Sequence, residues 1–310
     1  MIPPIKISYK KFLISFLILI SILLFFLNRY NTILNQKELD IFVSNQMKIV
    51  EDELENQKKQ ALSLALVFSK NQDIVKNLDD NNSKELKKEL LKLLEIIKAY
   101  TNQDIDVQIH TKNLEVFTRS WEDKDFGENL TSFREGLVKV KSSNKPFVSN
   151  ELGKRFNVKA IAPIYDKNNE FLGSIEIIID FKDFIYRLKN LGISSMILLE
   201  KDFLNIATSY KENKHIEEFV LLQNSFDKFN KELIKEVLNS DKLFIEQDSK
   251  IYSKIPLGNF GNKNAGVLVV CFEKFVKNFV YLPNYNYHGE FNLNDSERKY
   301  NNINKEIIIK

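Results

Sequence analysis

The sequence predicts an α+β fold, with one long N-terminal helix followed by two similar units that each hold an antiparallel sheet. Three observations support this prediction. A strongly apolar run near the N-terminus leads into a long stretch without glycine or proline, as is typical of a helix. After about residue 100 the hydrophobic pattern changes to the two-residue period of strands. The order of predicted strands then starts again after about residue 190, which indicates an internal repeat.

The composition is that of a globular protein. Of the 310 residues, 44% are hydrophobic and 28% are charged, which excludes a wholly disordered chain. The net charge of +3 is spread along the sequence rather than gathered in one block. A nucleic-acid-binding protein would need a clustered basic face, so we expect no nucleic-acid partner.

Residues 12–28 are predicted to be a transmembrane signal anchor. The uncharged run is slightly shorter than the roughly 20 residues that span a bilayer, but Asn28 and Tyr30 suit the membrane interface. A cleaved signal peptide begins in the same way, yet no small-x-small cleavage site follows, which favours an anchor that is retained. By the positive-inside rule, three lysines place residues 1–11 in the cytoplasm: Lys6, Lys10 and Lys11. We therefore expect a single-pass protein of the cell inner membrane, with most of the chain in the periplasm.

Residues 29–100 are predicted to form a long helical stalk and a second helix. The second helix is expected from about 83 to 100, with Ser83 as its N-cap. In the stalk, two interleaved series recur every seven residues, as in a coiled-coil seam: Val43, Val50, Gln57 and Leu64, and Met47, Leu54, Ala61 and Phe68. Two interpretations remain open, a stalk that forms a homodimer through this seam and an amphipathic helix that packs on its own domain.

Two units of about 90 residues are expected to follow, at 101–190 and 191–280, before a polar tail at 281–310. In both units a proline lies ten residues before a glycine that opens an apolar strand: Pro163 and Gly173, then Pro256 and Gly266. The first unit is predicted to hold strands at 105–110, 114–121, 158–165 and 171–180 and helices near 126–140 and 181–191. The second is predicted to hold strands at 195–200, 203–209, 243–246, 251–257 and 266–273 and a helix at 217–238.

The candidate binding residues lie in the first unit. Strand alternation is expected to place Phe117, Arg119 and Trp121 on one face of a strand. A guanidinium group beside aromatic rings suits a small anionic ligand, because it can bind a carboxylate with two hydrogen bonds. Arg134 follows on the next helix, and Glu176 interrupts an isoleucine-rich strand where the second unit has Val269. An ordinary ion pair between Arg119 and Glu176 on a half-solvated sheet is the simpler alternative.

Signatures of catalysis are lacking in the sequence. The three histidines, His110, His215 and His288, are scattered and have no companions at metal-ligand spacing. There is no glycine-rich phosphate loop and no Gly-x-Ser-x-Gly motif. The single cysteine, Cys271, lies in an apolar run and is expected to be a buried core residue. We expect no enzymatic activity, no metal ion and no cofactor.

Residues 114–180 resemble the membrane-distal half of double-Cache sensor domains, which are found in bacterial chemoreceptors, histidine kinases and diguanylate cyclases. The similar pieces are the sequences FTRSW at 117–121, FGENL at 126–130, FR at 133–134, APIYD at 162–166 and GSIE at 173–176. The resemblance implies a long N-terminal helix and two PAS-like units, with a ligand in the distal unit. It also implies that Arg119, Trp121, Arg134 and Glu176 line the pocket.

Two departures from that pattern stand out. Lys159 and Ala160 occupy a place where similar domains often have Arg and Gly, which could change the ligand. Such receptors also normally continue into a second membrane helix and an output domain, whereas few residues follow the last predicted strand here.

The sequence therefore predicts a non-catalytic, membrane-anchored sensor module without its own output domain. Its ligand is expected to be a small, anionic molecule of the carboxylate or amino acid type, and its signal would pass through the stalk or to a separate membrane partner. The alternatives are a truncated remnant of a chemoreceptor, histidine kinase or diguanylate cyclase, an envelope scaffold protein, and an uncharacterised hydrolase.

Overall fold

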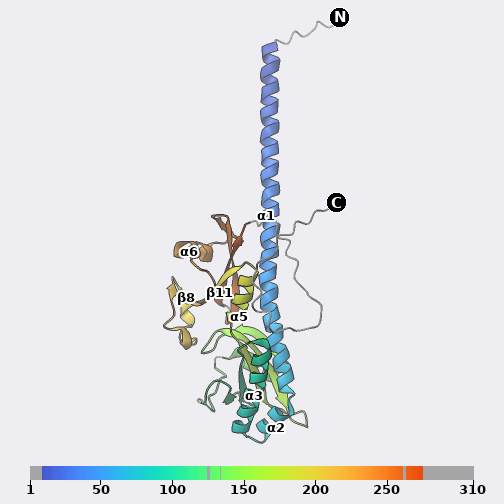
Figure 1. The fold of residues 1–310 in the computed structure, drawn as a ribbon, viewed down its shortest axis with the longest axis vertical. Helices are drawn as coiled ribbons and strands as arrows, with labels where there is room; N and C mark the ends of the chain where they lie inside the picture. Colours follow the sequence, from blue (N-terminus) through green and yellow to red (C-terminus); the bar gives the residue numbers. More distant parts are fainter. Residues whose placement is uncertain (1–8, 124–125, 133, 261–262, 275–310) are drawn as a thin grey trace.

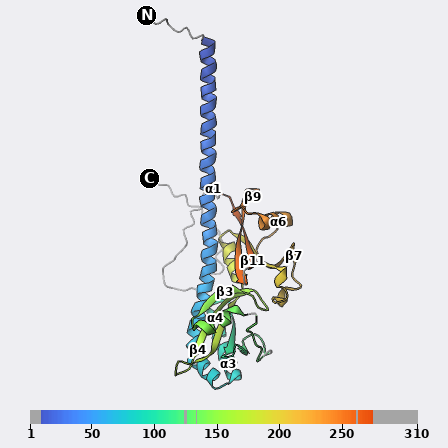
Figure 2. The same cartoon turned by 180° about the vertical axis from the view of Figure 1, so that it is seen from behind.

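The longest element is a single helix, α1 (Tyr9–Ser69), which runs from the N-terminal end of the molecule along two sheet-containing units (Figure 1). The computed structural model describes residues 9–123, 126–132, 134–260 and 263–274. At 61 residues, α1 is about 90 Å long. The view from behind shows that both units lie on the same side of α1, against its C-terminal half, and that its N-terminal half stands clear of them (Figure 2).

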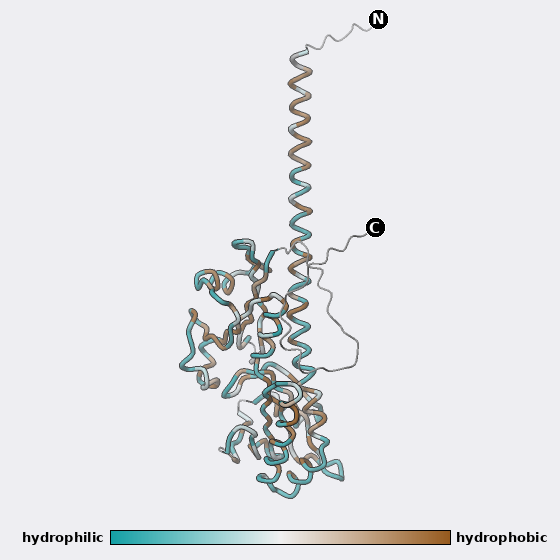
Figure 3. Tube along the Cα trace, in the orientation of Figure 1, coloured by the Kyte–Doolittle hydropathy of each residue, from teal (hydrophilic) through white to brown (hydrophobic). Residues whose placement is uncertain are grey.

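The N-terminal part of α1 has the length and composition of a membrane-spanning segment. An 18-residue window in this part has a mean hydropathy of 2.4 and no buried residue. Figure 3 shows it as the mostly brown end of the helix. Large side chains such as Phe12 and Leu24 are exposed there, as expected for a surface in contact with lipid. This agrees with the anchor predicted at residues 12–28.

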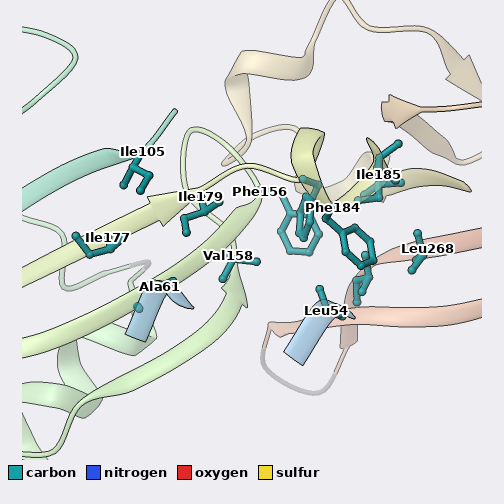
Figure 4. Packing of buried hydrophobic residues seen from close by; sticks show 14 of the residues in the cluster. Leu54, Ala61, Ile105, Phe156, Val158, Ile177, Ile179, Phe184, Ile185 and Leu268 are labelled. Carbon is teal, nitrogen blue, oxygen red and sulfur yellow. The ribbon is translucent and has the colours of Figure 1, made fainter. Parts of the chain in front are cut away.

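The heptad seam of α1 packs on its own chain. Val43, Val50 and Ala61 are fully buried, and the polar member of the seam, Gln57, is 1% exposed. Figure 4 shows Ala61 beside the sheet of the first unit and Leu54 beside the second. Of the two interpretations, packing on its own domain is therefore confirmed. A homodimer would have to use the face of α1 that remains exposed.

Two short helices follow α1: α2 (Gln72–Asp79) and α3 (Ser83–Thr101). The side chain of Asn82 accepts a hydrogen bond from the backbone of Glu85, so Asn82 is the N-cap of α3 and the prediction of Ser83 was wrong by one residue. Helix α2 was not predicted from the sequence. Its N-cap is Asn71, whose side chain accepts from the backbone of Asp73 and Ile74.

The first, membrane-distal unit holds a five-stranded antiparallel sheet in the order β2-β1-β5-β4-β3. One face of the sheet packs on α1, α2 and α3, and α4 (Glu135–Ser143) covers part of the other. All four predicted strands are present, and β3 is an additional one that was not predicted. The strands are β1 (Asp106–Thr111), β2 (Val116–Arg119), β3 (Phe147–Glu151), β4 (Asn157–Tyr165) and β5 (Phe171–Ile179).

Helix α5 (Lys182–Asn190) leads into the proximal unit, whose six strands are ordered β7-β8-β6-β11-β10-β9. The strands are β6 (Ser194–Glu200), β7 (His215–Ile216), β8 (Phe219–Asn224), β9 (Ile245–Gln247), β10 (Lys250–Phe260) and β11 (Lys263–Glu273). The polar tail predicted at 281–310 lies outside the described residues.

Two predictions for the proximal unit were wrong. The strand expected at 203–209 is replaced by two 3-10 turns, η1 (Lys201–Phe203) and η2 (Thr208–Tyr210). The helix expected at 217–238 is strand β8 in its first part, and helix α6 (Lys231–Asn239) begins only later. A short apolar run such as that of β8 fits either a strand or a helix by periodicity, and pairing with β6 decides between them.

The two units are structural repeats. In both, the glycine of the repeat pairs with the residue after the repeated proline, as Ile164 with Gly173 and Leu257 with Gly266. Both glycines also allow a close approach of the next strand. A Cβ atom added to Gly173 would lie 2.0 Å from the carbonyl oxygen of His110. A Cβ atom added to Gly266 would lie 2.5 Å from the carbonyl oxygen of Leu198.

Candidate functional site

The distal unit holds a cavity of about 300 Å³ beside its sheet. Side chains of the sheet, the loop before α4 and the loop between β3 and β4 line it, and Ser209 of the proximal unit completes one edge. The lining residues are Gln108, Arg119, Trp121, Glu122, Glu128, Leu130, Arg134, Gly153, Lys154, Arg155, Asn157, Lys159, Ile178 and Ser209. Basic side chains therefore outnumber acidic ones in the wall of this cavity.

A β-bulge decides which side chains of β2 reach this cavity. Gln108 of β1 pairs with Arg119 of β2. Further along β1, Ile109 pairs with Thr118 but His110 pairs with Val116, so Phe117 has no partner in β1. Because a bulge inverts the alternation of side chains, Phe117 lies in the hydrophobic core with α1 while Arg119 lines the cavity. The expectation that both residues share one face is therefore corrected.

Arg119 is held in place by polar partners from three directions. Its side chain, 4% exposed, donates to Gln108 Oε1 at 3.2 Å, to Glu122 Oε1 at 2.9 Å and to Glu128 Oε2 at 2.7 Å. The guanidinium carbon lies 5.8 Å from the centre of the Trp121 ring. Arg155 approaches the same ring at 5.5 Å. Trp121, 38% exposed, thus forms an aromatic wall between two cations.

Arg134 belongs to a second, deeper group of charges. It donates to Glu176 and, at 3.4 Å, to Glu151 Oε1. Burial alone would lower the pKa of Arg134, but the two carboxylates outweigh it and raise the pKa above its ordinary value. Glu176 is fully buried and reaches the cavity only through Arg134. One oxygen of each carboxylate, Glu151 Oε2 and Glu176 Oε2, accepts no hydrogen bond from the described residues.

His110 closes this group behind Glu176. Its Nε2 atom lies 2.9 Å from Gln108 Nε2 and 3.6 Å from Glu176 Oε2, and its Nδ1 atom lies 3.2 Å from Ser174 Oγ. Burial, and then the charge of Arg134, hold the pKa of His110 well below its ordinary value of 6.5. The imidazole is therefore neutral at physiological pH.

Lys159 is a cavity residue that was not among the predicted site residues. Its side chain is 3% exposed, and Nζ donates to the backbone carbonyl of Arg155 at 3.3 Å. Burial, and then the charge of Arg134, lower the pKa of Lys159 to about 7. The sequence held one signal for it, since Lys159 stands where similar domains often have arginine.

The structure thus brings Arg119, Trp121 and Arg134 together at one cavity. Glu176 accepts a hydrogen bond from Arg134, on the side of Arg134 away from the cavity. The simpler alternative, an ion pair between Glu176 and Arg119, is therefore not what the structure shows. Cys271 is a buried core residue at 6% exposure. The described residues hold no group of three or more His, Cys, Asp or Glu that could bind a metal ion.

Comparison with known proteins agrees with this architecture. Residues 42–270 match the family model dCache_3, described as the double sensory domain of two-component sensor kinase. No curated protein sequence is significantly similar to the chain.

Several solved sensor domains have a similar arrangement at low sequence identity. The sensor domain of the V. cholerae histidine kinase DctB is 13% identical, with a TM-score of 0.48 over 78% of this chain and 99% of that one. The ligand-binding domain of the Campylobacter jejuni chemoreceptor Tlp3 in complex with 4-methylisoleucine is 12% identical, with a TM-score of 0.45 over 79% and 96%. A domain of a sensory box/GGDEF family protein from Vibrio parahaemolyticus is 12% identical, with a TM-score of 0.42 over 74% and 94%.

The family model spans most of the chain, from the packed half of α1 to β11. The protein therefore belongs to the double-Cache family of sensory domains.

Proposed function

We propose that the protein is a membrane-anchored, non-catalytic sensor that binds a small anionic molecule in the cavity of its distal unit. The observation that carries the proposal is the cavity wall itself. Of its fourteen lining residues, five are Arg or Lys and two are Glu. This excess of cations favours an anion, and bidentate guanidinium groups suit a carboxylate.

The size and shape of the cavity narrow the ligand class. A volume of about 300 Å³ suits a metabolite of a few carbon atoms rather than a peptide. Trp121 and Leu130 offer apolar surface beside the cations, and Glu122 and Glu128 supply acceptors on the same wall. A carboxylate would lie against Arg134 and Lys159, and an amino acid could in addition direct its ammonium group to a glutamate.

The cavity is connected to both the proximal unit and α1. The loop from Gly153 to Arg155 lines the cavity. The backbone N–H of Ser209, in the proximal unit, donates a hydrogen bond of 3.1 Å to the carbonyl oxygen of Lys154 in this loop. On the other side, β5 carries Glu176 and ends beside Asp180, whose carbonyl accepts a hydrogen bond from Gln57 Nε2 of α1 at 2.6 Å. We propose that ligand binding shifts the equilibrium between two positions of α1 through these contacts.

The proposal includes a location. The apolar part of α1 would cross the inner membrane once, with the sensory units in the periplasm, because Lys6, Lys10 and Lys11 lie directly before the apolar run. A second copy of the chain or a separate membrane protein would receive the signal along the exposed face of α1.

A thermal-shift screen of the full chain in detergent tests ligand binding. Carboxylates and amino acids are added singly, and a true ligand at 100 times its dissociation constant stabilises the folded state by about 2.7 kcal/mol, or several degrees in Tm. Trp121→Ala should abolish the shift. Tyr186→Ala, which removes an exposed aromatic ring of α5 outside the cavity, should leave it unchanged. A well-folded chain that responds to none of these compounds would refute the proposal.

A further inference from the structure

Among the described residues, one basic side chain of the cavity wall has no carboxylate within ion-pair distance, whereas Lys154 Nζ lies 4.0 Å from Glu128 Oε2. Arg119 pairs with Glu122 and Glu128, Arg134 with Glu151 and Glu176, and Arg155 with Asp106. Lys159, by contrast, has no carboxylate within ion-pair distance among the described residues, and its amine makes a single hydrogen bond there, to Arg155 O.

The loop that holds Gly153 lies close to the amine of Lys159. A Cβ atom added at Gly153 would lie 2.6 Å from Lys159 Nζ, so the absence of a side chain at Gly153 lets the amine lie against the loop. An ammonium group has three donors, and Arg155 O accepts from one of them. The remaining donors of Lys159, which lines the cavity, lack acceptors that a bound anion would provide.

We propose that Lys159 selects for an anionic group in the distal cavity and takes up a proton from solvent as the anion enters. The inference rests on the proposed function and adds the residue that discriminates among ligands. Because its pKa is about 7, the amine of the empty cavity loses its proton as the pH rises through that value. When a carboxylate binds, a proton from solvent joins the amine, and the product is an ammonium–carboxylate pair with no other bond made or broken.

The charged groups around Lys159 are consistent with protonation of its amine when an anion binds. Burial, and then the charge of Arg134, lower the pKa of Lys159 to about 7, while Glu176 and Glu151 act in the opposite direction. Arg155 acts in the same direction as Arg134. His110 is neutral behind Glu176, and Arg119 lines the cavity from β2. A bound anion would add negative charge on the side of Lys159, so the pKa of the amine would rise and its charged form would persist to higher pH when the cavity is occupied.

The experiment measures binding of two probes, acetate and glycine, to the full chain in detergent between pH 6.5 and 8.5. Above pH 7 the association constant should fall by about tenfold per pH unit, because each binding event requires a proton. Calorimetry at pH 8 in HEPES and in Tris, whose ionisation enthalpies differ, should show uptake of close to one proton.

Three variants separate charge from shape. Lys159→Arg keeps a cation at every pH, so it should bind without the pH dependence and without proton uptake. Lys159→Met should lose most affinity below pH 7, while its unfolding temperature shows that the fold is kept. Lys88→Met, at an exposed site on α3, is the matched control and should behave as the wild type.

The outcomes distinguish this inference from the proposed function. Binding that is independent of pH, or that Lys159→Met leaves unchanged, overturns the inference and leaves the sensor function standing. If neither probe binds the wild-type chain at any pH, and the wider screen of carboxylates and amino acids also finds none, both are overturned.

Discussion

Glu176 places a carboxyl group inside the distal sheet, where the proximal unit has Val269 at the equivalent position. Such a charge is tolerated because Arg134 pairs with it, and Arg134 in turn is buried at 4% exposure. The ion pair thus fixes the position of a guanidinium group at the cavity wall. Its contribution to stability and to the site can be separated by mutation.

Glu176→Gln should lower the free energy of unfolding by about 3 kcal/mol, because it leaves Arg134 buried with only Glu151 as a charged partner. Denaturant unfolding of the full chain in detergent measures the change. The double variant Glu176→Val with Arg134→Met removes this pair but leaves the buried Glu151 without its guanidinium partner, so it should recover only part of the loss. Additive losses in the double variant would show that the two residues are not coupled.

His110 should make the distal unit less stable in mild acid. Its pKa in the folded protein lies well below 6.5, so between those values the unfolded chain binds a proton that the folded chain does not. Stability is therefore full above about pH 6.5 and decreases as the pH falls, by up to about 1.4 kcal/mol per pH unit. Unfolding curves at pH 7.5 and 5.5 measure it.

The matched variants for this pH effect are two histidine substitutions. His110→Gln should flatten the dependence on pH, whereas His215→Gln, at an exposed position of β7, should not change it. The same slope in wild type and in His110→Gln would assign the acid sensitivity to other groups.

At the scale of elements, the patterns that repeat over many residues were predictable and single-residue irregularities were not. The period-seven series identified α1, and the period-two series identified four of the five distal strands. The bulge at Phe117 leaves no mark in the sequence, because it depends on how β2 pairs with β1. The same holds for β8, whose apolar residues fit a helix until the neighbouring strand is known.

The residues of the candidate site also differ in how far the sequence predicts them. Arg119, Trp121 and Arg134 could be predicted because they lie in short motifs, and Glu176 because it breaks an apolar run. A lysine in an alternating strand ordinarily points to solvent, so strand alternation alone does not place Lys159 in a binding site. Only the fold shows that this face of β4 is covered.

The two repeat glycines allow a test of the shared sheet geometry. Gly173→Ala should destabilise the protein by about 3 kcal/mol or more, because the added methyl would meet the backbone of β1, which cannot move independently of the sheet. Gly266→Ala should do the same in the proximal unit. Thermal unfolding measures both.

Gly192 provides the control for backbone conformation. It follows α5 with φ of +77°, and no atom lies within 4 Å of the position that an added Cβ would take. Gly192→Ala should therefore cost only about 1 kcal/mol, the strain of a left-handed backbone. If Gly173→Ala costs no more than Gly192→Ala, the close approach of β1 and β5 is not what requires glycine.

At the scale of the whole molecule, α1 connects the apolar N-terminal segment to both sheet-containing units. Its apolar half stands alone, whereas its other half supplies side chains to the cores of both units, as Leu54 and Ala61 do (Figure 4). Glu53 adds an ion pair of 2.9 Å to Arg187 on α5, the helix between the units. A shift of α1 along its axis would therefore disturb both cores and the connector at once. This argues that α1 responds as a rigid rod rather than by local bending.

The orientation of that rod in the membrane is testable with single cysteines. In a Cys271→Ala background, Val67→Cys lies at an exposed site near the C-terminal end of α1, and Ile2→Cys lies ahead of the N-terminal lysines. In spheroplasts of a bacterial host, a membrane-impermeant maleimide should label Val67→Cys at once and Ile2→Cys only after the membrane is disrupted. The positive-inside rule gives this direction, because the lysines precede the apolar run. Labelling of Ile2→Cys in intact spheroplasts, with protection of Val67→Cys, would place the sensory units in the cytoplasm and remove the basis for an extracytoplasmic sensor.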